Sequence, residues 1–179
     1  MSGIENYNRA IEFKGPAYLP CSITVNLDWM HDKHAAKHER IRELVAQFPD
    51  DLVGWVNAAC NTTEPVCQDS VKRWKDEWLT EWVDDGHGAR TVSYPLSQGY
   101  HALADYTFPD PHQEHRFAEA DKRLNDRGDR YVQAAVWFTL FERLWMLRGF
   151  ENMLMDPYTN VHEFCLLRDR IVEYNLEMI

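Results

Sequence analysis

The chain has 179 residues, of which 45% are hydrophobic, 27% charged and 13% aromatic, and its formal net charge is -10. This profile fits one globular domain with a core of its own, and the negative charge argues against nucleic acid as a partner. No apolar run approaches the roughly 20 residues that cross a bilayer, and the N-terminus has no apolar signal segment, so we expect a cytoplasmic protein without membrane contact.

The N-terminal region is expected to contain a short helix and a strand. Residues 5–13 have a helical pattern, which the glycine and prolines of residues 14–20 interrupt. The segment CSITVNL (21–27) then has the character of a strand. Asp28 and Trp29 follow at its carboxyl end, where ligands bind in α/β folds, so we predict that both lie at the mouth of a substrate pocket.

A helix is predicted over residues 32–48, and its first turns carry closely spaced histidines. His34 and His38 are four residues apart, share a helix face and could bind a metal together with His31. The neighbouring lysines oppose a cation and no third ligand is fixed nearby, so we favour a solvated polar face and predict no metal site. The cysteines lack zinc or redox spacing and are expected to be reduced thiols: Cys21, Cys60, Cys67 and Cys165.

The middle of the chain is predicted to form a short helix and then a hairpin. Residues 67–74 fit a short helix. The DDGHG sequence (84–88) is a strong turn signal before the strand-like RTVSY, so we expect a hairpin from Glu77 to Tyr94. A helical stripe is the alternative, because three tryptophans recur at four-residue spacing: Trp74, Trp78 and Trp82.

A proline- and aromatic-rich loop over residues 93–115 follows, and residues 112–126 fit an amphipathic helix. The apolar residues expected on its inner face are Phe117, Ala120 and Leu124.

The last third of the chain has the pattern of a strand followed by helices. Residues 129–138 are rich in aromatic and β-branched residues, as in a strand buried on both faces, and a helix after them is expected to end at Gly149. Asn160 and Glu163 form a capping-box pattern at the start of a final amphipathic helix. Its apolar face is Phe164, Leu167, Ile171, Tyr174 and Met178. A strand followed by helices is the repeating unit of an α/β fold.

Several segments, in this order, resemble the uroporphyrinogen decarboxylase superfamily, which also includes corrinoid and cobalamin-independent methyltransferases. They are RAIEFKGPAYLP (9–20), DEWLTEW (76–82), YPL (94–96), LADYTFPDP (103–111), RYVQAAVWFTLFERLWMLRGFENMLMD (130–156) and the closing EYNLEMI. The resemblance covers nearly the whole chain and corresponds to about the first half of a family member. It implies a single domain over residues 1–179, the N-terminal half of a (β/α)8 TIM barrel with a β-hairpin insertion and several amphipathic helices.

The resemblance also implies a role for one carboxylate. In decarboxylase members an active-site aspartate follows an early strand, and Asp76 is the nearest positional match. Two features differ from the family pattern: SVKRWK (70–75) is polar, and Leu79 stands where relatives often have Gly. The arginine-rich motif of true decarboxylases is missing after the first strand, where the chain has NLDWMHDKH. A polycarboxylate substrate needs such guanidinium partners, which argues against a classical porphyrinogen decarboxylase.

Aromatic residues at the end of the strand of residues 129–138, and just after it, are candidates for a substrate pocket. They could line a flat pocket for a ring-shaped ligand, and packing within the core is the alternative that we favour. These residues are Trp137, Phe138 and Phe141. Nearby, Glu142 is expected to form ion pairs on the helix face with Arg143 and Arg148.

The resemblance does not decide whether this chain is catalytically active. In methyltransferase members a His and a Cys on later strands hold the zinc that activates a thiol, and these ligands have no counterpart here. We therefore expect no cofactor in this chain, although zinc or a corrinoid partner belongs to a full-length relative of that type. Half a barrel leaves an unpaired strand edge and an uncovered apolar stripe. We expect either a truncated member without a complete active site, which would bind a small-molecule substrate once a complementing half is present, or a non-catalytic module that forms a homodimer.

Overall fold

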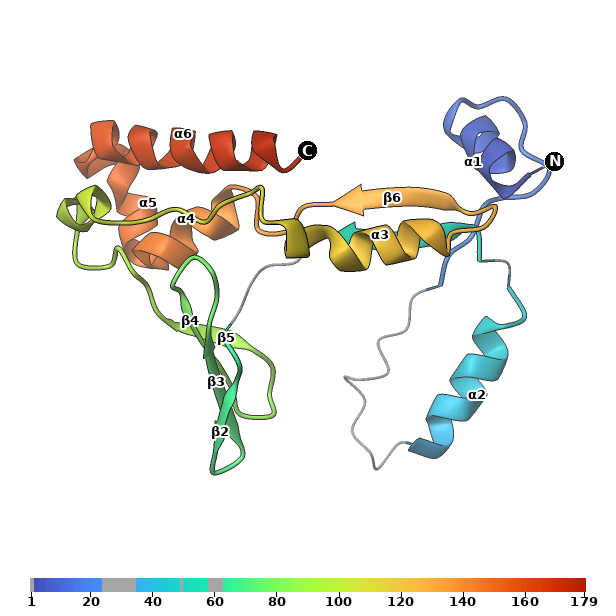
Figure 1. Cartoon of the computed structure of the whole chain (residues 1–179), viewed down its shortest axis with the longest axis horizontal. Coiled ribbons are helices and arrows are strands. Elements are labelled where there is room, and N and C mark those ends of the chain that lie inside the picture. The colour runs from blue at the N-terminus through green and yellow to red at the C-terminus, as the bar shows by residue number, and fades with distance from the viewer. Residues whose placement is uncertain (1, 24–34, 49, 58–62) are drawn as a thin grey trace. The chain divides into compact units, whose positions relative to one another are not determined.

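A computed structural model describes residues 2–23, 35–48, 50–57 and 63–179 (Figure 1). Helices and strands are mixed, which confirms the α/β class, and the described strands form two small sheets without a closed barrel. The chain divides into two compact units. Unit 1 contains residues 1–57 and 118–135, and unit 2 contains residues 58–117 and 136–179. The predicted strand 21–27 lies mostly outside the described residues, and its first three residues are not in a strand.

Unit 1 is built around a pair of parallel strands. Its elements are α1 (Gly3–Ile11), α2 (Ala35–Val45), β1 (Leu52–Asn57), α3 (Ala118–Asn125) and β6 (Tyr131–Ala135). The pairing of β1 with β6 runs from Leu52 opposite Tyr131 to Asn57 opposite Ala135. Ala120 of α3 packs with Val53 and Val132 to form a small core. A strand, a helix and a parallel strand therefore follow one another here, with most of unit 2 inserted before the helix.

The sequence predicts the described helices and β6 of unit 1, with differences in extent and burial, but it does not predict β1. The N-terminal helix is confirmed as α1, and the described part of the helix at 32–48 is α2. The helix predicted at 112–126 is a 3-10 turn, η4 (Glu114–Phe117), followed by α3. Strand β6 is confirmed, but its burial on both faces is not, because Gln133 and Ala134 are exposed.

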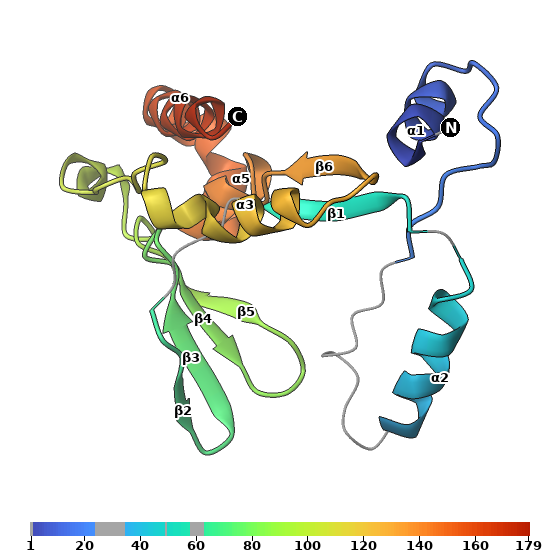
Figure 2. The ribbon, with the colours of Figure 1, turned by 45° about the vertical axis from the view of Figure 1, so that its right-hand side comes forward.

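Unit 2 combines an antiparallel sheet with three helices (Figure 2). The strands β2 (Val66–Gln68), β3 (Val71–Lys75), β4 (Glu81–Asp84) and β5 (Arg90–Ser93) pair in sequence order. Two 3-10 helices, η3 (Tyr100–Ala104) and η4, and the helices α4 (Phe141–Arg148), α5 (Phe150–Thr159) and α6 (Val161–Glu177) complete the described part of the unit. The buried core joins Trp78 and Leu96 to the helices through Leu144, Leu147, Met153, Leu167 and Ile171.

The predicted hairpin is confirmed as β4 and β5, and the short helix predicted at 67–74 is wrong. Residues 66–75 instead form the hairpin of β2 and β3, turned by Asp69 and Ser70 in left-handed conformations. Trp74 lies opposite Trp82 across β3 and β4, with parallel rings 6.1 Å apart, so the tryptophan spacing reflects strand pairing and not a helical stripe.

The helical end of unit 2 follows the sequence closely. Helix α4 ends at Gly149, whose φ of +83° favours glycine. A Cβ at this position would also lie 3.3 Å from the ring of Tyr94. Helix α6 begins after Asn160 as predicted, but the side chain of Asn160 makes no capping bond and instead donates to Asp156 Oδ1 at 3.0 Å. The predicted capping box is therefore wrong.

Candidate functional site

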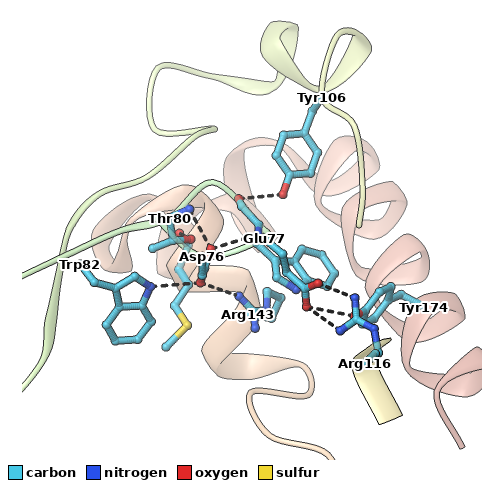
Figure 3. Close-up of polar contacts among 10 residues, drawn as sticks. Asp76, Glu77, Thr80, Trp82, Tyr106, Arg116, Arg143 and Tyr174 are labelled. Atoms are coloured by element: carbon cyan, nitrogen blue, oxygen red, sulfur yellow. Dashed lines mark hydrogen bonds and ion pairs between the residues drawn. The ribbon is translucent and has the colours of Figure 1, made fainter. Parts of the chain in front are cut away.

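The loop between β3 and β4 is folded around the carboxylate of Asp76 (Figure 3). Asp76 Oδ1 accepts the backbone N–H groups of Trp78 and Thr80, each at 3.0 Å. The backbone closes the same turn, since the Asp76 N–H donates to the Thr80 carbonyl at 3.1 Å. Aspartate is suited to such a turn because its short side chain can accept hydrogen bonds from the following residues. Asp76 is 7% exposed, so its carboxylate lies in the interior of unit 2.

The second oxygen of Asp76 connects the loop to β4 and α4. Oδ2 accepts from Trp82 Nε1 at 3.1 Å and from Arg143 Nη1 at 3.3 Å. The Arg143 guanidinium lies 4.5 Å from the centre of the Trp78 ring and 5.7 Å from that of Phe138. Two aromatic rings and one carboxylate therefore surround this buried cation, which combines cation–π attraction with an ion pair.

The next residue, Glu77, forms a second buried ion pair. Both of its oxygens accept from the Arg116 guanidinium, with Nη1 2.9 Å from Oε1, and the Tyr174 hydroxyl donates to Oε1 at 3.2 Å. Arg116 also donates to the Asp110 carbonyl at 3.0 Å. The side chains of Arg116 and Glu77 are 0% and 6% exposed, so this pair is almost fully removed from water.

A small hollow lies among these groups. It has a volume of about 20 Å³, which is room for about one water molecule. Its lining includes Glu77, Trp78, Arg116, Trp137, Phe138 and Arg143. Phe138 has a φ of +54°, which is unusual for a bulky residue. Such strained residues often occur at functional sites, and the hollow is therefore the best candidate site in unit 2.

A third buried ion pair stabilises the helical end of the same unit. Arg148 donates to the two oxygens of Asp156 at 2.7 and 3.1 Å, and Tyr100 donates its hydroxyl to the same carboxylate at 2.8 Å. Burial alone would raise the pKa of Asp156, but the hydrogen bonds from Arg148, Tyr100 and Asn160 lower it overall. Burial, and then the neighbouring carboxylate, raise the pKa of Tyr100.

The structure brings together only some of the residues that the sequence singled out. Asp76, Trp137 and Phe138 meet around the hollow and its ion pairs, whereas Phe141 is half exposed and packs its ring edge-to-face with Phe150. Asp28 and Trp29 lie outside the described residues, as do His31 and His34.

Sequence reasoning did not find the cationic partners of the two carboxylates. Arg116 gives no local signal, and Arg143 was expected to pair on its own helix face. The structure corrects that expectation: Arg143 pairs with Asp76 and Arg148 with Asp156. Among the described residues, no three His, Cys, Asp or Glu side chains lie together as a metal site. No helix in the described part of the chain is long and apolar enough to cross a membrane.

Leu79 provides a local test of the loop. Its φ is +62° and its side chain is 48% exposed, so it has a strained backbone and little burial in return. We expect Leu79→Gly to raise the free energy of unfolding by roughly 0.5–1 kcal/mol, because glycine adopts this conformation without a steric penalty. Urea unfolding should show this gain, and Leu79→Ala, which keeps the Cβ, should lack it. Equal stability of the two variants would contradict the role of the backbone conformation.

Comparison of the chain with models of known protein families, with curated proteins and with solved structures finds no match in any of the three.

Proposed function

We propose that this chain forms the first strands and helices of a barrel of the uroporphyrinogen decarboxylase superfamily, in a cytoplasmic protein whose substrate is a small molecule. The parallel pairing of β1 with β6 is the observation that carries the proposal. In a (β/α)8 barrel each strand is joined to its parallel neighbour through a helix. Here α3 precedes β6 and packs on β1 in the same way, and the antiparallel sheet occupies the place of an insertion.

The conformation of Leu79 also supports the family assignment. This residue stands where members of the superfamily often have glycine, and its φ of +62° is one that glycine adopts easily. The DEWL sequence (76–79) therefore has the backbone that a DEWG sequence would favour. The local loop shape is compatible with the family pattern even though the residue differs.

The reaction implied by the family is a decarboxylation or a methyl transfer. Asp76 accepts four hydrogen bonds from the loop, Trp82 and Arg143, so we assign it the positioning of Trp78 and Arg143 at the hollow. The zinc of methyltransferase-type relatives does not fit the described residues: their cysteines are Cys21, Cys67 and Cys165, and none of these belongs to a group of three possible metal ligands.

Trp137 is the residue on which a ring-shaped substrate would stack. It lines the hollow and is 52% exposed, so part of its ring is accessible at the mouth. We expect the chain to bind a flat ring system without carboxylate groups, such as acridine, seen as a shift of its main absorption band. Trp137→Ala should weaken binding at least about fivefold, because a stacking contact of this kind contributes about 1–3 kcal/mol and 1.4 kcal/mol corresponds to a factor of ten.

Tyr158→Ala is the matched control, because Tyr158 is an aromatic residue on α5 that is 84% exposed and does not line the hollow. This variant should bind like the original chain. Binding that is equal in the Trp137 and Tyr158 variants, or absent from the original chain, would count against a ring-binding pocket at this site.

A homodimer or a complementing half of the barrel is the second candidate, favoured by exposed apolar residues on α5 and α6. On α5, Phe150, Leu154 and Tyr158 recur every four residues, which places them on one face, and Met155 is exposed as well. The exposed apolar residues of α6 are Val161, Leu166, Val172 and Leu176. Sedimentation of the purified chain, with urea unfolding in parallel, tests this candidate. A dimer whose unfolding depends on concentration supports self-association, and a monomer with a concentration-independent transition excludes it.

A further inference from the structure

Arg143 has more hydrogen-bonding capacity than its surroundings use. The residue is 2% exposed, and among the described residues its guanidinium donates one hydrogen bond, from Nη1 to Asp76 Oδ2 at 3.3 Å. Its Nε–H is buried and has no partner in the part of the chain that the structure describes. A buried donor without an acceptor costs about 1–3 kcal/mol, and more when the group is charged. An acceptor oxygen at this position would remove that cost.

The start of α4 follows in the chain shortly after residues that line the hollow. The N-cap position, Leu140, has no side chain that can accept a hydrogen bond from the first turn. The first N–H groups of a helix have no partner within the helix and, together with its dipole, favour a negative charge. Residues 136–138, which precede this N-terminus in the sequence, line the hollow. Arg143, in the first turn of the helix, lines it too.

The carboxylates nearby do not supply the missing acceptor. Asp76 uses both oxygens on the loop, Trp82 and Arg143, and Glu77 uses both on Arg116 and Tyr174. Each carboxylate is paired with one arginine, so the group has no excess negative charge. The hollow beside these groups has room for one oxygen atom and is bordered by the flat rings of Trp78, Trp137 and Phe138.

We propose that this hollow is a binding site for a small carboxylate, one oxygen of which accepts the Nε–H of Arg143. The Nε and Nη2 atoms form an edge of the guanidinium that can donate two parallel hydrogen bonds to the two oxygens of a planar carboxylate. Flat aromatic walls suit such a planar group better than a tetrahedral one. The left-handed backbone of Phe138 holds its ring at this position. The inference rests on the geometry of unit 2 alone and stands whether or not the chain belongs to a barrel.

The test follows the arginine Nε–H signals of the full chain by nuclear magnetic resonance. Sodium formate, the smallest carboxylate, is added against sodium chloride at equal ionic strength, with phosphate as a third series. We expect one buried Nε–H signal to shift saturably with formate and not with chloride. Arg143→Lys should remove that signal and weaken formate binding at least tenfold. Arg168→Lys is the matched control, since Arg168 lies partly exposed on α6 beside Asp169, and it should bind as the original chain does.

Phe138→Gly is a second variant, which keeps Arg143 and also protects the test if Arg143→Lys fails to fold. It removes one wall and should weaken formate binding several-fold while the Arg143 signal remains. The proposal is overturned if the signal responds equally to chloride. It is also overturned if phosphate binds more tightly than formate, or if folded Phe138→Gly binds formate as well as the original chain does.

Discussion

Replacement of Arg148 by Met is expected to lower the free energy of unfolding by about 3–5 kcal/mol. Arg148 donates to both oxygens of Asp156 and to the Leu96 carbonyl, and its guanidinium lies 4.3 Å from the centre of the Tyr100 ring. Asp156 is 1% exposed and would keep its charge in the interior without a cationic partner. The large cost comes from this unpaired carboxylate, since an intact buried ion pair contributes little net stability.

Urea unfolding of three variants separates these contributions. The double variant Arg148→Met with Asp156→Leu should recover most of the lost stability, because it removes both charges. Arg168→Met, which removes a partly exposed arginine on α6, should cost no more than about 1 kcal/mol. A loss in Arg148→Met no larger than in Arg168→Met would show that the Asp156 carboxylate does not depend on Arg148.

Acid should weaken the same network. The pKa of Asp156 is lower in the folded chain than its usual value of 3.8, so its stabilising contribution is complete above that value. The contribution is then lost as the pH falls through the folded pKa. In the Asp156→Asn variant this part of the acid dependence should be absent.

Replacement of Asp76 by Ala is expected to cost about 3–5 kcal/mol, a loss of the same size. The change leaves the N–H groups of Trp78 and Thr80 without their acceptor and leaves Arg143 buried without its carboxylate. Unfolding should be followed by tryptophan fluorescence and by circular dichroism.

The control for this change is Asp84→Ala. Asp84 also accepts a backbone N–H two residues ahead, that of Gly86 at 2.8 Å, but this turn is exposed. Its removal should cost about 1 kcal/mol or less. If Asp76→Ala is as mild as Asp84→Ala, the β3–β4 loop does not depend on the Asp76 carboxylate, and Asp76 would be available for a direct role with a substrate.

The hairpins show which parts of this fold the sequence could predict. The turn between β4 and β5 is visible because DDGHG supplies two glycines in left-handed conformations, Gly86 and Gly88. The turn between β2 and β3 uses Asp69 and Ser70 in the same conformation without a glycine, so its signal is weak. Strand β3 reads VKRWK and is mostly exposed, which hides the alternation that marks a strand.

The candidate site could be predicted only where its residues are local in sequence. Asp76 was singled out by its position in the family resemblance, and Trp137 and Phe138 because they lie at the end of a strand-like segment. The arginines that pair with the two carboxylates of the site lie far along the chain. Arg116 is 39 residues from Glu77, and Arg143 is 67 residues from Asp76. Pairing over such distances is decided by tertiary packing, and a single sequence does not carry it.

The parallel pair of unit 1 also determines the order in which the chain can fold. The ion pair between Asp50 and Arg130, beside the start of β1 and β6, joins residues 80 positions apart. Contacts over such separations form slowly because a long loop must close first. At a synthesis rate of about 5–20 residues per second, roughly 4–16 s pass between the synthesis of β1 and that of its partner strand, β6. The hairpins of unit 2 form from adjacent residues and can assemble within that interval, which leaves the edges of β1 exposed to chaperones or to other chains.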